Sequence, residues 1–406
     1  MKLVNFWEKS YRHREGLSGI HAIYINNLMR TLAWSLAGLF SPLYIFFLGY
    51  EQGGLIAGLK VVILAIVVER SLVMLLSLPL GKLVFRLGFK WSILLGSFLL
   101  SIYFLLPSIF PRSILLIVVM SVVAAFEILI YWIARLSIMS LDGEKSHYGH
   151  DISFLAITER LVSILGPFVG GYLVTRGGFA SMFAVVTVVS IISALPIFFI
   201  RDHKITDGIS FSGLVEFLKN EKNRHLNIAF FGQGLNNAID GFFWPIYFFL
   251  VLKSYELIGG VTTVVTGLTI LVVYLAGRRF DRLRALGGDE DEKSFTLATW
   301  WMALLTVTRP FFGGVMSLIS YDLVVSLSGP FWWISYDSYL YSAGKRFPSP
   351  LAFYAYREVI YSVGRFSVVL LLFFVLDVIP VNLIWWVLFG LSGLGIALAN
   401  GMKKES

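Results

Sequence analysis

Three charged residues lie inside long apolar stretches of the sequence: Arg30, Glu127 and Asp240. An ionisable side chain at the centre of a bilayer costs ~2.5 kcal/mol or more, so such residues mark ion or substrate sites. At ~1.5 Å per helical residue, all three fall near the middle of their stretches. We hypothesise that Glu127 binds a coupling proton, or the cationic part of a substrate, while Arg30 tunes its proton affinity. A purely structural salt bridge between the two is the alternative.

Asp240 is the second candidate for proton binding, and a carboxyl held protonated by local hydrogen bonds is its alternative. Asp322 and Asp337 lie toward opposite ends of another apolar run and rank below Glu127. Aromatic side chains suit an amphipathic or cationic ligand, and amides could bind it or simply join helices. These predicted binding residues are Asn26, Asn27, Gln233, Asn236, Asn237, Trp132, Trp244, Trp332, Trp333 and Tyr336.

A second charged set fits a gate. Glu69 and Arg70 lie about as deep as Arg365, so a Glu69–Arg365 pair could latch one state of a transport cycle, unless Glu69 and Arg70 satisfy each other locally. Four residues at the inner rim of the predicted bundle look like gate ion pairs that complement two short basic turns, at 81–90 and 277–282, with plain solvated charges as the alternative. They are Glu159, Arg160, Arg357 and Glu358.

Composition shows what must position these residues. The 406 residues are 57% apolar and 14% charged, with mean hydropathy +0.79, which excludes a soluble globule. There is no cysteine, so disulfide and thiolate chemistry are excluded. No nucleotide-binding loop or metal-ligand spacing is present, so we expect no enzyme, metal or cofactor. Twelve membrane spans are predicted at 18–47, 53–81, 89–110, 113–141, 153–175, 179–200, 226–252, 257–277, 294–312, 314–342, 353–376 and 381–400.

Most of the 33 Lys and Arg residues fall on one side of this map. The positive-inside rule then puts both termini in the cytoplasm, so the net charge of +8 is a signal of topology, not of nucleic-acid binding. The polar stretch 201–226 repeats Phe211, Leu214, Val215, Phe217 and Leu218 at helical spacing. It predicts an amphipathic linker helix on the inner leaflet, with an unstructured tether as the alternative.

The two sides of this linker repeat each other in the same direction. Pro42 begins a run of aromatic and aliphatic residues that a run at Pro245 echoes, and Trp132-Ile133 is echoed by Trp333-Ile334. We therefore predict two six-helix bundles, at 1–200 and 227–406, related by an axis along the membrane normal.

Short motifs connect this architecture to a known family. Gly81, Leu83, Arg86, Gly88 and Lys90 resemble the loop between helices 2 and 3 of the major facilitator superfamily, with Phe85 in place of that loop's aspartate. A second copy keeps Gly277, Asp281 and Arg282, and helix 5 carries Gly166, Pro167, Gly170 and Gly171, similar to an element of the superfamily's proton-driven exporters; a plain packing kink is the alternative. The resemblance implies that helices 1, 4, 7 and 10 line a central cavity, so Arg30, Glu127 and Asp240 would face a common space.

The predicted function is alternating-access transport, namely proton-driven efflux of an amphipathic or cationic organic solute across a prokaryotic-type inner membrane by a monomer. A lipid or lysolipid transporter is one alternative, favoured by the aromatic wealth. A transport-inactive membrane sensor or assembly factor is another, favoured by Phe85. A membrane-embedded transferase is the most distant.

Overall fold

A computed structural model describes residues 19–142, 158–199, 209–286 and 288–405, and no strand occurs among them. The first part contains α2 (Gly19–Ala37), α3 (Ser41–Ile109), α4 (Ile114–Glu127), the π-helical turn η1 (Ile128–Trp132), α5 (Ile133–Asp142) and α7 (Gly166–Ala194). The second contains α8 (Phe211–Lys219), α9 (Arg224–Ala238), the π-helical turn η4 (Ile239–Phe243), α10 (Trp244–Leu252), α11 (Tyr255–Leu286), α12 (Gly288–Thr308), the 3-10 turn η5 (Arg309–Phe311), α13 (Val315–Arg346), α14 (Pro350–Val375) and α15 (Val381–Leu398).

Glycines let the longest helical stretches fold back on themselves. Helix α3 has 69 residues, which would extend about 100 Å if straight, three times the thickness of a hydrocarbon core. Its backbone leaves helical geometry at Gly54, with φ 71°, and at Gly88, with φ 81°; α7 does so at Gly178, with φ 72°. Positive φ is readily adopted only by glycine. The predicted basic turn at 81–90 is therefore a reversal at one glycine.

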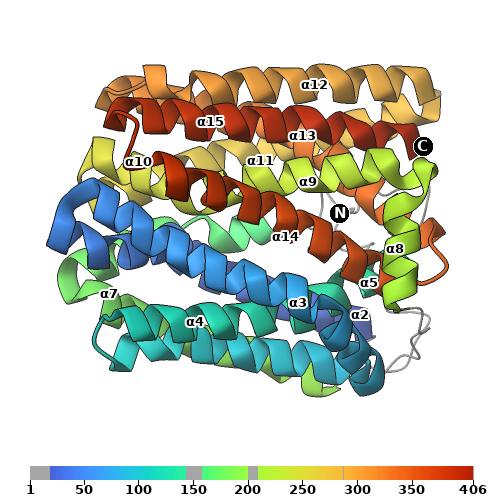
Figure 1. Ribbon diagram of the computed structural model, residues 1–406, viewed down its shortest axis with the longest axis horizontal. Helices are drawn as coiled ribbons and strands as arrows, with labels where there is room; N and C mark the ends of the chain where they lie inside the picture. Colours follow the sequence, from blue (N-terminus) through green and yellow to red (C-terminus); the bar gives the residue numbers. More distant parts are fainter. Residues whose placement is uncertain (1–18, 143–157, 200–208, 287, 406) are drawn as a thin grey trace, which may run out of the picture.

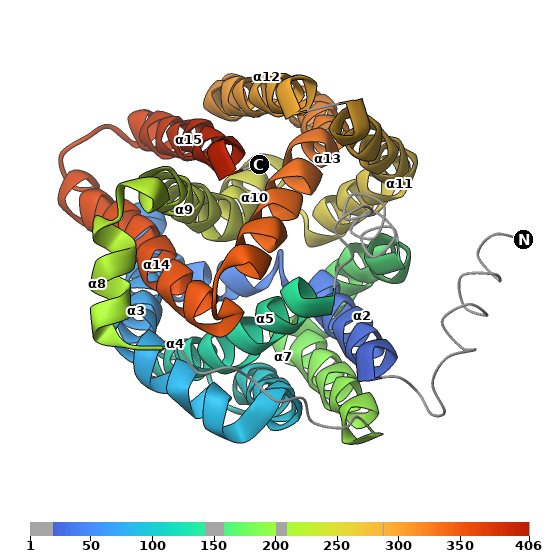
Figure 2. The same cartoon turned by 90° about the vertical axis from the view of Figure 1, so that its right-hand side faces the viewer.

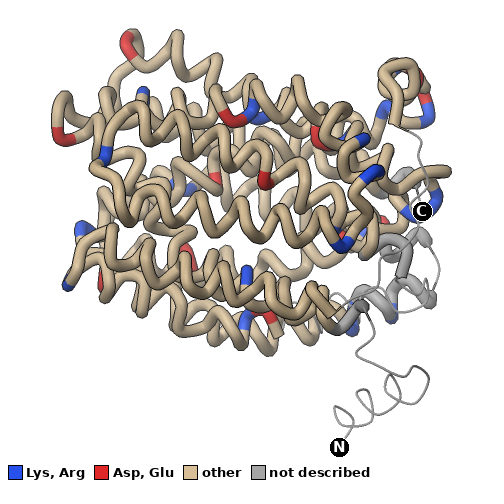
Figure 3. The backbone as a smooth tube through the Cα atoms, turned by 90° about the horizontal axis from the view of Figure 1, so that it is seen from below, with Lys and Arg blue, Asp and Glu red and all other residues tan. Residues whose placement is uncertain are grey.

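Eight helical stretches of the described chain are long and apolar enough to cross a membrane. The long helices lie side by side along one axis, and few charges interrupt their middle portions (Figures 1 and 3). Such a bundle satisfies its backbone hydrogen bonds internally, as a bilayer requires. The chain is therefore an all-α membrane protein, whereas twelve separate spans and cytoplasmic termini stay predictions.

Helices from the first part of the chain pack on one another, since α3 contacts α4 and α7, and α2 contacts α7. In the second part, α9 contacts α14 and α15, α12 contacts α15, and α11 contacts α13. The two groups meet where α14 packs on α3, α11 on α7, and α5 on α13 and α14 (Figure 2). We call these groups the N-terminal and C-terminal halves; the boundaries 1–200 and 227–406 stay a prediction.

The linker does form the predicted helix. The Ser210 hydroxyl caps α8 by accepting from the Gly213 backbone N–H at 2.9 Å, and α8 lies across the ends of the long helices (Figure 1). Leu214 and Phe217 are buried, and the Phe217 ring meets Phe353 of α14. Phe211 is exposed. The apolar face of α8 therefore covers protein, and its contact with a leaflet stays a prediction.

Candidate functional site

A cavity of about 720 Å³ lies between the two halves. Residues of α2, α3, α4, η1 and α5 line it from the N-terminal half, and residues of α9, η4, α13 and α14 from the C-terminal half. Ten of the lining side chains carry ionisable groups of both signs: Arg30, Glu69, Arg70, Glu127, Arg135, Glu159, Asp337, Arg357, Glu358 and Arg365. Five arginines and five carboxyl groups thus line one shared space.

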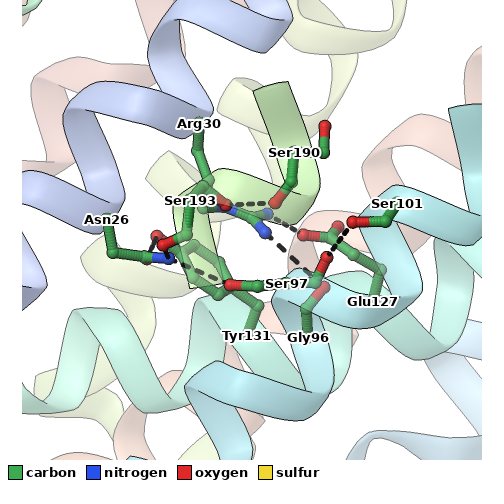
Figure 4. Close-up of polar contacts among 9 residues, drawn as sticks. All are labelled: Asn26, Arg30, Gly96, Ser97, Ser101, Glu127, Tyr131, Ser190 and Ser193. Carbon is green, nitrogen blue, oxygen red and sulfur yellow. Dashed lines mark hydrogen bonds and ion pairs between the residues drawn. The ribbon is translucent and has the colours of Figure 1, made fainter. Parts of the chain in front are cut away.

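Arg30 and Glu127 meet in this cavity as an ion pair, and both are almost fully buried (Figure 4). The guanidinium of Arg30 also lies over the Tyr131 ring, 3.4 Å from its centroid. The turn η1 starts directly after Glu127, and a π-helical turn widens a helix at functional sites. The sequence predicted this pair, and its role in proton binding stays a prediction.

A hydrogen-bond network behind Arg30 holds the aromatic ring in place (Figure 4). The Tyr131 hydroxyl donates to Asn26 Oδ1 at 3.1 Å, and Asn26 Nδ2 donates to Ser97 Oγ at 3.0 Å and to the Ser193 carbonyl at 2.6 Å. Asn26 is fully buried and is not a lining residue of the cavity. Its geometry therefore fits a helix-packing contact that positions Tyr131, the alternative raised from the sequence.

Glu159 lines the cavity beside Arg135 of α5, the helix that follows η1. Its carboxylate lies 3.5 Å from Arg135 Nη2 and accepts a hydrogen bond from Asn27 Nδ2. Arg160 turns away and donates to Thr269 Oγ1 of α11 at 2.9 Å. The expected pairing of these residues with the basic turns is therefore not what the described chain shows. Glu159 is committed to the cavity instead.

Charges on α3 and α14 meet across the halves. Glu69 pairs with its neighbour Arg70 and lies 3.8 Å from Arg365 Nη1, so the local pair and the predicted pair between halves occur together. On α14, Arg357 Nη1 and Glu358 Oε1 are 2.5 Å apart. The expectation of a rim position for this second pair is wrong, because Arg357 and Glu358 are buried and line the cavity.

Asp240 does not share the space that Arg30 and Glu127 occupy, so that expectation is wrong. It is not a lining residue of the cavity and pairs with Arg309 of η5. Arg309 also donates from Nε to the Tyr321 hydroxyl at 3.2 Å and lies 4.5 Å from the centroid of the Trp244 ring. The sequence showed no cation within the helix of Asp240, and the partner comes from a segment 69 residues away.

The other predicted binding residues divide in the same way. Those that line the cavity are Asn27, Gln233, Asn237, Trp132, Trp333 and Tyr336. Asn236 accepts a hydrogen bond from Ser392 Oγ at 2.8 Å, Trp244 packs under Arg309, and Trp332 is buried against the Tyr336 ring. Helix rotation explains the division, since adjacent positions point about 100° apart. In the neighbouring pairs at 26–27, 236–237 and 332–333, only the second residue lines the cavity.

The Gly-Pro element brings two helices into backbone contact. A Cβ on Gly171 would overlap the carbonyl of Tyr255 at the start of α11, and one on Gly259 would overlap the carbonyl of Pro167. Gly166 and Gly170 approach α2 equally closely, at Ser35 and Leu36. α7 therefore packs on the other half, as its motif predicts.

The basic turns contribute packing at their glycines and charge at their arginines. A Cβ on Gly81 would overlap Ile209, and Gly277 is buried in α11. Arg86 and Arg282 are exposed, and the side chain of Asp281 lies outside the described residues. Their gating role stays a prediction.

Sequence reasoning ranked Asp337 too low and missed Arg135, Tyr361 and Arg309. Asp337 lines the cavity although it lies well away from the middle of α13 along the chain. Tyr361 lies between two arginines of its own helix, with the guanidinium carbons of Arg357 and Arg365 each 4.8 Å from its ring centroid. The spacing of Arg357, Tyr361 and Arg365, four residues apart each time, is the signal that places them on one helix face.

The sequence matches the Major Facilitator Superfamily over residues 23–366, most of its length. The chain belongs to the major facilitator superfamily. No curated protein matches the sequence of this superfamily member. Its structure resembles that of the E. coli fucose:proton symporter, with TM-score 0.62 and 15% identity, covering 94% of this chain and 97% of that chain. At this identity the likeness shows the fold.

Within the superfamily fold, the ion pairs of the described residues that involve a buried arginine lie in two separate places. The cavity between the halves holds the pairs built on Arg30, Arg70, Arg135, Arg357 and Arg365. Arg309 and Asp240 lie apart, within the C-terminal half. The site that can bind a solute from both halves is therefore the central cavity.

Proposed function

We propose that this superfamily member is a secondary transporter that exports an amphipathic or cationic organic solute in exchange for protons. The observation that carries the proposal is a buried carboxylate, Glu127, in a cavity that both halves line. A volume of about 720 Å³ suits a drug-sized or smaller molecule. Rocking of two halves about a site between them is the usual route of alternating access.

Export against a proton needs one group that a proton and a substrate can share. Glu127 is paired with Arg30, which itself rests on Tyr131, so the proton and a cationic substrate would each compete with the same guanidinium for the carboxylate. Proton binding at Glu127 would release Arg30 and change the contacts between α2 and α4. Energy would come from the proton gradient, without a cofactor or an enzymatic step.

The proposal includes twelve spans and cytoplasmic termini in a prokaryotic-type inner membrane. Reversals at Gly54 and Gly88 would divide the stretch Ala22–Ile109 into three spans, and a reversal at Gly178 would divide Thr158–Phe199 into two. With the other six candidate stretches and α12, the total is twelve. Lys82, Arg86 and Lys90 gather at the end of the bundle where α8 lies, which supports a cytoplasmic location for that end. Nothing in this arrangement requires a second copy, so we propose a monomer.

Proteoliposomes with an imposed pH gradient test the exchange. We expect tetraphenylphosphonium, as a simple amphipathic cation, to move against its own gradient while an enclosed pH dye reports protons moving the other way. Glu127→Gln should abolish the proton movement, because a neutral amide cannot carry a proton.

Asp322→Asn is the matched control, since Asp322 is on α13 but does not line the cavity. Solute movement that ignores the pH gradient, with no proton signal for wild type, would overturn the exchange. Binding without any movement would favour a sensor instead.

A further inference from the structure

One carboxyl group in the cavity has no counterion. Glu69, Glu127, Glu159 and Glu358 each pair with an arginine. Asp337 also lines the cavity, yet among the described residues it makes no ion pair within 4.0 Å and no hydrogen bond. The charges that act on it from a greater distance are those of Arg357, Arg135 and Glu159. Asp337 is therefore within electrostatic reach of two guanidinium groups and one carboxylate, but it makes direct contact with none of them.

Aromatic side chains surround this unpaired acid. Trp333, Tyr336 and Tyr341 line the cavity on the same helix, within four positions of Asp337. Ring faces and a carboxylate both attract an ammonium group, and the attraction is strongest where water is scarce. This corner of the cavity is therefore suited to a cationic nitrogen.

The part of the cavity wall on α3 and α14 carries more arginines than carboxylates. Arg70, Arg357 and Arg365 stand there against two carboxylates, those of Glu69 and Glu358. All three arginines are at least nine-tenths buried and line the cavity.

The same three arginines have unused hydrogen-bond donors. In each of them the buried Nε–H lacks an acceptor among the described residues. A buried donor without a partner costs free energy comparable to a lost hydrogen bond. A carboxylate from the solute would satisfy these donors and neutralise the excess charge.

We propose that the cavity binds a zwitterion, with its ammonium at Asp337, its carboxylate or other anionic group at the Arg70, Arg357 and Arg365 wall, and an apolar or aromatic body beside them. Trp34, Leu100 and Phe242 line the remaining space and would cover that body. This substrate class rests on the proposed transport function and narrows it. The cationic group of the solute predicted from the sequence would then be one of its two charged ends.

Three probes that share a phenyl ring and differ in their charged groups separate the two ends. Phenylalanine carries both charges, phenethylamine only the ammonium, and 3-phenylpropanoate only the carboxylate. We measure the affinity of the detergent-solubilised full chain for each probe by calorimetry. Phenylalanine should bind about tenfold or more tightly than either singly charged probe, the value of one charge-assisted hydrogen bond.

Single substitutions should remove one end at a time. Asp337→Asn should weaken phenylalanine and phenethylamine about tenfold and leave 3-phenylpropanoate unchanged. Arg365→Gln should weaken phenylalanine and 3-phenylpropanoate and spare phenethylamine. Asp322→Asn, on the same helix but outside the cavity lining, should alter none of the three. Elution as a single species in detergent shows that each variant is folded.

A zwitterionic lysophospholipid carries the same two charges, so lysophosphatidylcholine below its micellar concentration is the fourth probe. If it binds with the same dependence on Asp337 and Arg365 while phenylalanine does not, the zwitterion site holds and its ligand is a lipid. The proposal is overturned if phenethylamine binds as well as phenylalanine, if Asp337→Asn has no effect, or if none of the four probes binds. Zwitterion binding without movement into proteoliposomes would contradict the transport function alone, whereas proton-driven movement of cations only would contradict this inference alone.

Discussion

The molecule contains two arginine–carboxylate pairs of similar construction, each with a buried arginine, in different surroundings. Arg30 pairs with Glu127 over the ring of Tyr131, and Arg309 pairs with Asp240 over the ring of Trp244. Each acid also borders or lies within a π-helical turn. Only the first pair lines the cavity between the halves. Both buried arginines therefore have a carboxylate partner, and we propose a role in transport only for the pair that faces the cavity.

The largest expected effect separates function from stability at the first pair. Replacing both partners, Arg30→Gln with Glu127→Gln, removes the buried charges together, so the fold should survive. We expect proton-coupled transport in proteoliposomes to fall about 100-fold, because no carboxylate remains to exchange a proton. If this double variant transports normally while its melting temperature falls, the first pair serves stability and not transport, and the proposed difference between the pairs is wrong.

The second prediction concerns the other pair. Asp240→Asn leaves Arg309 buried without its counterion and should destabilise the protein by about 2–3 kcal/mol, less than for a fully buried pair because the Asp240 side chain is 35% exposed. Transport per folded molecule should stay within about twofold of wild type. Thermal unfolding in detergent measures the loss, and adding Arg309→Met should restore most of it. Loss of transport in a stable double variant would give this pair a direct role.

The smallest effects come from the hydroxyl groups beside each arginine. Tyr131→Phe removes the hydrogen bond to Asn26 and keeps the ring under Arg30, whereas Tyr321→Phe removes the acceptor for Arg309 Nε and the donor to the Leu305 carbonyl. Each should lower the stability by about 1 kcal/mol. Only Tyr131→Phe should also raise the KM for transport, by a few-fold. Equal changes in KM for both variants would show that the two arginine–carboxylate pairs do not differ in their role in transport.

The sequence predicted the fold and the first pair because both follow from simple physics. Apolar length and charge asymmetry determine how a chain lies in a bilayer, and depth along a helix brings Arg30 to the level of Glu127. The glycines at 81, 166, 170 and 171 also pack as closely as their motifs suggest.

The positions of the remaining site residues could not be predicted, because they depend on the rotation of each helix about its axis and on loop geometry. Depth does not specify direction, so Asp240 was assigned to the cavity although it faces Arg309. Arg357 and Glu358 were assigned to a rim, because a basic helix end resembles one whether or not a neighbouring half covers it. Predicted helix 1 also breaks at Gly38–Phe40, just before Pro42, whose ring cannot continue a regular helix. Such breaks and π-helical turns rotate every later side chain, which a uniform helical period cannot anticipate.

The contact between α7 and α11 has a mechanical consequence. Backbone touches backbone there, at Gly171 against Tyr255 and at Gly259 against Pro167, with no side chain between them that a rotamer change could withdraw. Neither helix can move closer at these two points, so we expect the seam to act as a pivot when the halves move. With the pivot at one end of the bundle, a rotation of about 10° would separate the far ends, ~30 Å away, by about 5 Å, the width of a small solute.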